Sequence, residues 1–236
     1  MDFARPLMPG TLLRRYKRFL ADVMRDDGTE VTAHCANPGA MLGLDAPGTR
    51  VWLEPVASPP RKLAHAWRLV ELPEGGFAGI DANLPNGLVA EALAAGAIPS
   101  AAGYGAIRRE VPYGARNRVD FLLEAPGRPR LWLEVKNVHL CRTEGLAEFP
   151  DCVTTRGARH LQALAEMVAA GDRAVLLYVV QRTDCTRLRL AADLDPAYAR
   201  AAAAARAAGV EMVAHATAID PVGVRLRGPI PIDHAG

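Results

Sequence analysis

The sequence predicts two domains, a small β-barrel over residues 1–82 and an α/β domain with a mixed sheet over residues 83–236. Short segments of strand character, separated by turns that contain Gly and Pro, fill the first part and indicate an all-β unit. From Asn83 onward helical and strand signals alternate, which is typical of a sheet flanked by helices. The chain has 236 residues and is 50% hydrophobic, so it holds ample material for a real core.

The predicted barrel depends on short strands that tight turns separate. Asp26-Asp27-Gly28 and Asn37-Pro38-Gly39 are two of these turn signals. A count of about five strands in this length fits an OB-fold barrel better than an immunoglobulin-type sandwich. The clearest strand segments are residues 19–24, 30–34, 50–54 and 66–72.

The second part has the pattern of helices packed on a mixed sheet. Asn86 is expected to cap a helix over residues 87–95, which Gly96 ends. A continuous apolar run over residues 174–181 indicates a strand that is buried on both faces. Further strands are predicted at 106–113, 118–123, 130–135 and 210–214, and further helices at 155–170 and 196–208.

Basic residues form two local groups, although the formal net charge is only +2. Clustered cations attract phosphates even on a nearly neutral molecule, and a solvated surface strip is the alternative interpretation. Tyr16, Phe19 and Trp67 either stack on unpaired bases or fill the barrel core. The basic groups are Arg14, Arg15, Lys17 and Arg18, and Arg108, Arg109, Arg116 and Arg118.

Cysteine spacing and hydropathy exclude several classes of protein. The cysteines lie far apart without a C-x-x-C pair, so neither a zinc site nor a disulfide scaffold is predicted. The cations from Arg14 to Arg18 interrupt any signal peptide, and the longest apolar run, residues 174–180, is too short to cross a bilayer. A cytoplasmic protein with reduced thiols and no membrane partner is therefore expected. The four cysteines are Cys35, Cys141, Cys152 and Cys185.

Two neighbouring strand segments carry the residues that point to chemistry. Strand side chains alternate, so Glu134 and Lys136 leave the same face of their strand. If the two segments form a hairpin, Asp120 approaches Glu134. Two carboxylates repel each other and need a counter-charge, which Mg²⁺ supplies in sites built on one or two carboxylates. Such a metal activates water, and Lys136 can then assist that water or stabilise a phosphate in the transition state.

A plain structural interpretation of these residues stays open. Glu134 and Lys136 are then an ordinary ion pair on the exposed face of a strand. Glu91, in the predicted helix before the two strands, is either a third acidic ligand or a solvent-facing residue.

Three further polar residues are candidates for supporting roles. Arg156 and His160 lie four residues apart at the start of a predicted helix, so they share a face. They either contact a phosphate, with His160 relaying a proton, or His160 is a buried residue that bonds to a neighbouring strand. Gln181 ends a buried strand, where its amide needs a partner. Asp151 is expected to cap the helix rather than join the site.

The order of these elements resembles the PD-(D/E)xK nuclease superfamily: a helix with an acid, a strand with Asp, a strand with E-x-K, a helix and a strand. The resemblance implies that Asp120 and Glu134 hold Mg²⁺ (or Mn²⁺) and that Lys136 assists the attacking water. It also implies Glu91 as a helix acid in the metal site and Gln181 as a supporting residue.

A closer resemblance covers essentially the whole chain. The motifs are His34-Cys-Ala-Asn-Pro-Gly-Ala-Met41, Ala66-Trp-Arg-Leu-Val70, Pro85-Asn-Gly-Leu88, Leu133-Glu-Val-Lys-Asn137, Phe149-Pro-Asp-Cys-Val-Thr-Thr-Arg-Gly-Ala-Arg-His-Leu161 and Val179-Val-Gln-Arg182. Together they are similar to the sugar fermentation stimulation protein A family. That family implies an N-terminal OB-fold, a nuclease-like C-terminal domain, non-specific DNA binding and a link to maltose and other sugar metabolism.

The sequence is compatible with three functions. The first is a Mg²⁺-dependent DNA nuclease, the second is a non-catalytic DNA-binding regulator on a nuclease-like fold, and the third is an RNA-directed OB-fold protein. The intact Asp-Glu-Lys set favours the first, and the lack of a helix-turn-helix signature weakens a sequence-specific repressor. The oligomeric state stays open, a homodimer included. The predicted nucleic-acid contacts are Arg14, Arg15, Lys17, Arg18, Arg118 and Arg156.

Overall fold

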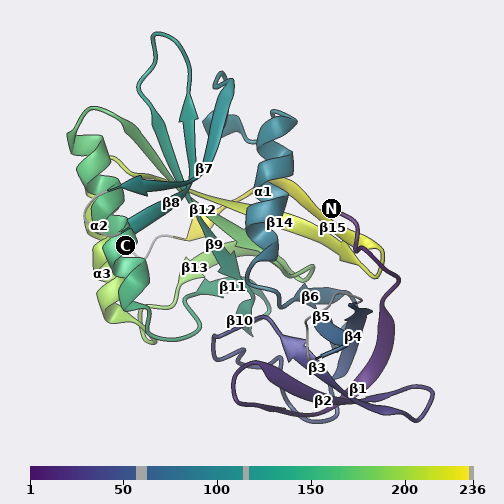
Figure 1. Ribbon diagram of the computed structural model, residues 1–236. Coiled ribbons are helices and arrows are strands. Elements are labelled where there is room, and N and C mark those ends of the chain that lie inside the picture. Colours follow the sequence, from purple (N-terminus) through teal and green to yellow (C-terminus); the bar gives the residue numbers. More distant parts are fainter. Residues whose placement is uncertain (57–62, 114–116, 234–236) are drawn as a thin grey trace.

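Five strands of the N-terminal part close into a barrel in the computed structural model, which describes residues 1–56, 63–113 and 117–233 (Figure 1). Antiparallel pairing joins β1 to β2, β2 to β3, β1 to β4 and β4 to β5, and parallel pairing of β3 with β5 closes the ring. This architecture confirms the predicted OB-fold. The strands are β1 (Met8–Tyr16), β2 (Leu20–Arg25), β3 (Glu30–Cys35), β4 (Arg50–Pro55) and β5 (His65–Glu71).

Strand β1 is the barrel strand that the sequence prediction missed. Its early Pro and Gly and its late arginines hide the alternation of apolar residues by which a strand is recognised. Gly10 is needed there for space, because a Cβ would lie 2.7 Å from Val23 Cγ1 and 2.8 Å from the carbonyl oxygen of Met24. The barrel core contains Leu12 of β1 and Trp67 of β5, both fully buried.

Six strands form the mixed sheet of the C-terminal part, in the order β15-β14-β12-β9-β8-β7. The central pairs β9–β12 and β12–β14 are parallel, and the outer pairs are antiparallel, so the predicted mixed sheet is confirmed. The strands are β7 (Ala106–Tyr113), β8 (Asn117–Glu124), β9 (Leu131–Val138), β12 (Arg173–Val180), β14 (Glu211–Asp220) and β15 (Gly223–Ile230).

Helices cover both faces of this sheet (Figure 1). Apolar residues of α2 (Thr155–Ala169) and α3 (Pro196–Ala207) share one core with the sheet. Apolar residues of α1 (Leu84–Ala94) belong to the core on the other face, and a short 3-10 helix (Pro99–Ala101) follows. Among the described residues, no helix combines the length and the apolar character needed to span a membrane.

The helix starts differ from the predicted caps. Thr154, and not Asp151, caps α2, because its hydroxyl accepts a hydrogen bond from the N–H of Gly157 at 3.1 Å. Asp195 caps α3 and also accepts the N–H of Thr154 at 2.8 Å, so one buried carboxylate fixes both helix starts. Asn86 lies inside α1 and does not cap it.

A second, smaller sheet was not predicted, because its strands are only two to six residues long. It has the order β10-β11-β13-β16. A further short strand, β6, extends the barrel sheet and contacts the C-terminal part through a bridge between Ala78 and Arg182. These strands are β6 (Phe77–Gly79), β10 (Leu140–Thr143), β11 (Gly145–Phe149), β13 (Cys185–Leu190) and β16 (Ile232–Asp233).

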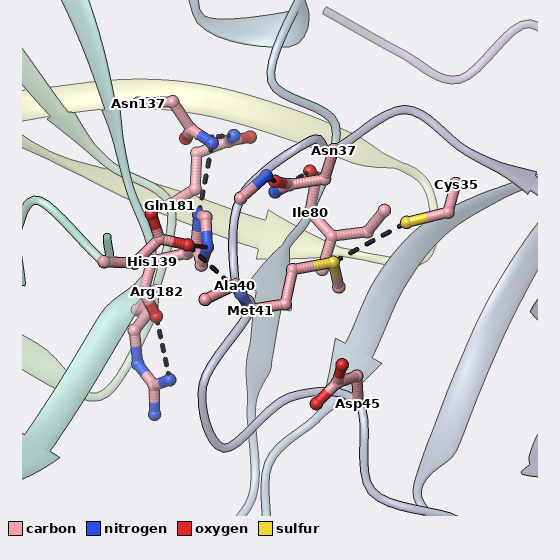
Figure 2. A network of polar contacts seen from close by, with 12 residues as sticks. Cys35, Asn37, Ala40, Met41, Asp45, Ile80, Asn137, His139, Gln181 and Arg182 are labelled. Atoms are coloured by element: carbon pink, nitrogen blue, oxygen red, sulfur yellow. Dashed lines mark hydrogen bonds and ion pairs between the residues drawn. The ribbon is translucent and has the colours of Figure 1, made fainter. Parts of the chain in front are cut away.

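The loop that follows β3, residues 36–49, joins the barrel to the C-terminal part and is the junction loop of this protein (Figure 2). Asn37 donates its amide to the carbonyl of Ile80 at 2.7 Å and accepts the N–H of Gly39 at 2.8 Å, so its side chain shapes the turn. Beyond the turn, the N–H of Met41 donates to Asp151 at 3.1 Å. The same carboxylate lies 3.3 Å from Nε2 of His139. Asp151 therefore ties the barrel to the segment that leads into α2.

Replacement of Gly39 by Ala should destabilise this junction. An added Cβ would overlap Oδ2 of Asp151 and would lie 3.0 Å from Oδ1. The expected loss is about 1–3 kcal/mol in the free energy of unfolding, as for other overpacked sites, and denaturant unfolding measures it.

Gly105→Ala is the matched control, because no atom lies within 4 Å of its added Cβ. Equal stability of the two variants would contradict the assigned contact between Gly39 and Asp151.

Candidate active site

Strands β8 and β9 separate at the level of the predicted acidic residues. Their ladder pairs Leu123 with Leu131 and ends at the pair Phe121–Leu133. Asp120 is next in register, opposite Glu134, but its Oδ2 accepts the N–H of Val135 at 2.7 Å. A carboxylate thus replaces the backbone partner at a fork in the sheet.

The strand on the other side of β8 is distorted at the same level. The neighbours of Glu110 on β7 pair with the neighbours of Asp120 on β8, and Glu110 itself has a φ of 52°. This left-handed conformation is costly for a residue with a side chain, and such strain gathers at functional sites. The carbonyl of Glu110 accepts a hydrogen bond from Arg118 at 2.8 Å.

Glu134 is buried, with an exposed fraction of 3%, and its two oxygens have different surroundings. Oε1 accepts hydrogen bonds from Lys136 Nζ at 2.7 Å and from Nδ1 of His160. Oε2 is buried and, within the described part of the chain, has no hydrogen-bond partner. Buried polar atoms are normally paired, so this oxygen offers a free ligand position beside Asp120.

The two carboxylates are electrostatically unlike. Burial and the negative charge of Glu134 raise the pKa of Asp120. Burial by itself would also raise the pKa of Glu134, but the hydrogen bonds and charges of His160 and Lys136 outweigh it, so that this pKa lies below its ordinary value. A cation between the carboxylates would relieve the repulsion that Asp120 experiences.

His160 connects the site to α2 as the spacing predicted. It is buried, and its Nε2 lies 3.2 Å from Nε of Arg156, which can only donate. Nδ1 therefore carries the ring proton that is shared with Glu134. Of the two interpretations of His160, the structure shows the one in which the ring is buried and bonds to a neighbouring strand. Its partner on that strand is Glu134, the central carboxylate of the site.

The helix acid Glu91 is not brought to the site. Its side chain is 59% exposed and pairs with the N-terminal ammonium group of Met1 at 2.8 Å. Asn86, which the prediction used as a cap, takes its place and donates to Oδ1 of Asp120 at 2.8 Å. Five residues separate the two positions, a turn of about 140° around a helix, so they lie on different faces. The only sign of this contact in the sequence was the polar side chain of Asn86 in the first turn of α1.

Gln181 lies at the interface between the two parts of the chain (Figure 2). Among the described residues, no hydrogen bond joins its side chain to Asp120 or Glu134. Its amide nitrogen donates to Asn137 Oδ1 at 2.7 Å and to the carbonyl of Asp81 at 3.1 Å. Gln181 therefore supports the strand end that follows Lys136, rather than the carboxylates themselves.

The N-terminal basic group divides into structural and exposed members. Arg15 donates to the carbonyls of Asn37 and Gly39 at 2.9 Å each and pairs with Asp45, so it holds the junction loop and is not free for phosphate. Arg14 is exposed but pairs with Asp22 at 2.8 Å. Lys17 and Arg18 are exposed at the turn between β1 and β2.

Arg118 of the second basic group lines a pocket beside His160. The pocket has a volume of about 660 Å³ and lies between β7, β8 and the start of α2. Arg118 and Arg156, both predicted contacts for nucleic acid, line it together with Arg159, which the prediction missed. His160 forms part of its wall and bonds to Glu134 behind it. Arg116 lies outside the described residues.

Two of the cysteines are closer than their spacing indicated. The ligand atoms of Cys141, Asp184 and Cys185 lie within 4.8 Å of one another, a group able to hold a metal ion. Arg182 already binds both oxygens of Asp184, at 2.9 and 2.7 Å. Burial raises the pKa of the Cys185 thiol and disfavours the thiolate that binds metals. This group shares no residue with the candidate active site.

Both parts of the chain match described families. Residues 13–80 match the family described as SfsA N-terminal OB domain, and residues 83–223 match the Sugar fermentation stimulation protein RE domain. Among solved structures, Pyrococcus furiosus SfsA in complex with Ca²⁺ superposes with a TM-score of 0.89 and 27% identity, over 99% of this chain and 98% of that one.

Curated relatives are similar over their whole length. The sugar fermentation stimulation protein homolog of Jannaschia sp. (strain CCS1) is 62% identical over 234 residues, which are 99% of this chain and 97% of the relative. The homolog of Dinoroseobacter shibae is 62% identical over 236 residues, with coverage of 100% and 97%. With both domains matched and relatives of this identity, the chain belongs to the sugar fermentation stimulation protein family.

Proposed function

We propose that this protein is a divalent-metal-dependent hydrolase of DNA phosphodiester bonds, with Mg²⁺ or Mn²⁺ as its metal. The observation that carries the proposal is Oε2 of Glu134, a buried carboxylate oxygen without a partner among the described residues, next to a second carboxylate. An ordinary ion pair with Lys136 would leave no reason to bury that oxygen unpaired, because such burial costs about 1–3 kcal/mol.

The residues fit a hard divalent cation. Asp120 and Glu134 supply carboxylate oxygens, the ligands that Mg²⁺ and Ca²⁺ prefer. The related P. furiosus protein was solved in complex with Ca²⁺, a cation of the same class. A metal held here would lower the pKa of bound water and stabilise negative charge on a phosphate.

The other side chains hold the carboxylates and face the substrate. Lys136, whose side chain is 12% exposed, is fixed by Glu134 at 2.7 Å, so its ammonium group is positioned to orient a water or to stabilise charge that develops on the phosphate. His160 orients Glu134, and Arg156 fixes the ring of His160. Asn86 fixes Asp120. Each carboxylate thus has a defined direction before metal or substrate binds.

Glu134→Gln and Lys136→Ala should abolish cleavage of labelled DNA in Mg²⁺ or Mn²⁺, with rates reduced at least about 100-fold, because each removes a group that stabilises the transition state. Fluorescence anisotropy without metal should show that both variants still bind DNA.

Glu124→Gln is the matched control for this pair, since Glu124 is a carboxylate on β8 that lies 3.8 Å from Arg108. It should cleave like the wild type. Binding by wild type and variants without any cleavage would replace the hydrolase with the non-catalytic DNA-binding regulator.

His160→Ala should weaken the binding of Mn²⁺ by about 10- to 100-fold, because the ring positions the carboxylate that ligates the metal. Isothermal titration of the folded protein measures this affinity without reference to turnover. His65→Ala, in barrel strand β5, is the control and should bind Mn²⁺ normally. An unchanged affinity in His160→Ala would remove His160 from this role.

Asn86→Ala and Glu91→Ala separate the two faces of α1. Loss of the Asn86 amide frees Asp120 to rotate and should reduce cleavage about tenfold or more, whereas loss of Glu91 removes only an exposed pair with the N-terminus. Cleavage assays at saturating metal compare the two. A larger defect in Glu91→Ala would mean that the helix acid binds the metal after all.

A further inference from the structure

An exposed aromatic pair lies where β2 begins and β3 ends, at the end of the barrel that we call the barrel tip. Phe19 is 44% exposed, and its ring stacks on that of His34, with 6.3 Å between centroids and 13° between planes. Trp67, by contrast, is buried, so the aromatic residues proposed for base stacking divide between surface and core. Two aligned, exposed rings provide a flat face of the kind on which an unpaired base stacks.

The aromatic pair lies next to the segment that leads into α2. The N–H of Cys35, the residue after His34, donates to the carbonyl of Phe19 at 2.9 Å. Sγ of Cys35 lies 3.6 Å from Sδ of Met41. The N–H of Met41 is also bound to Asp151, so the barrel and the start of α2 are held together here. Arg18 directly precedes Phe19, and both are exposed.

Exposed arginines continue from this point toward the carboxylates. Arg156 and Arg159 lie on the first turns of α2, and Arg118 faces them from β8 across the pocket of about 660 Å³. The pocket ends at His160, which bonds to Glu134. The exposed arginines therefore extend from the barrel through the start of α2 to the candidate active site, and within the pocket they outnumber the two glutamates, Glu110 and Glu166, that also line it.

The dimensions and the chemistry of this path suit one polynucleotide strand. A volume of about 660 Å³ lies within the range of sites for small ligands, roughly 300–1,000 Å³, and is far from enclosing a duplex. A duplex also keeps its base faces stacked inside, so the rings of Phe19 and His34 would have no base to contact. A single strand offers both a free base face and a flexible backbone that can enter the pocket.

From these contacts we infer that the site takes single-stranded DNA, with a base on the Phe19–His34 pair and phosphates along Arg18, Arg156, Arg159 and Arg118. The inference rests on the proposed function and deepens it, because it names the form of DNA that reaches Glu134. The preference arises from stacking and from the size of the pocket, and not from the sequence of the strand.

Fluorescence anisotropy of the full-length protein, in buffer without metal, tests the inference with labelled oligodeoxythymidine, a duplex of equal length and oligouridine. The single-stranded DNA should bind at least about tenfold more tightly than the duplex. Phe19→Ala and Arg159→Ala should each weaken single-strand binding about tenfold and change duplex binding much less, and Phe19→Tyr should restore it.

Arg200→Ala is the matched control, because Arg200 is an exposed arginine on α3 that does not line the pocket. Equal or tighter binding of duplex would overturn the inference and leave the proposed DNA hydrolase standing. Tighter binding of oligouridine would overturn the choice of DNA, and binding of none of the three polymers would overturn both proposals.

Discussion

The buried charge of Glu134 is the constraint that organises the C-terminal part of this protein. An ionised carboxylate with an exposed fraction of 3% is costly to remove from water, by several kcal/mol, unless partners compensate it. Lys136 from the same strand and His160 from α2 both bind its Oε1, so the packing of α2 on the sheet and the ionisation of the site depend on one atom. The other oxygen keeps its capacity to accept.

The junction loop extends this constraint to the barrel. Asp151 lies between the site helix and the barrel, where it accepts the N–H of Met41 and pairs with His139. Asn37 and Arg15 hold the same loop through its backbone. Short polar contacts therefore fix the barrel to the start of α2. The surfaces of the barrel and of α2 are continuous at this point.

The sequence could predict those parts of the fold and of the site in which residues recur at a regular spacing. Alternation along β9 placed Glu134 and Lys136 on one face, and a spacing of four placed Arg156 with His160. The surroundings of Glu91 and Arg15 could not be predicted, because exposure and hydrogen-bond partners depend on contacts distant in the sequence. Glu91 has the solvent-facing position of its two alternatives, and Arg15 binds the backbone of the loop after β3. The strands of the second sheet are two to six residues long, too short for a period to stand out in the sequence.

The proposed binding and the proposed hydrolysis involve different layers of this site. The arginines that line the pocket are exposed, and their charge acts on any phosphate that approaches. Glu134 is buried and Asp120 is half-buried, so these carboxylates act only on a phosphate that has entered the pocket. The outer layer of arginines can therefore hold a DNA strand whether or not the inner layer of carboxylates has bound a metal ion. The two candidate functions differ in the inner layer alone, and the buried, unpaired oxygen of Glu134 is the feature that a purely binding surface has no use for.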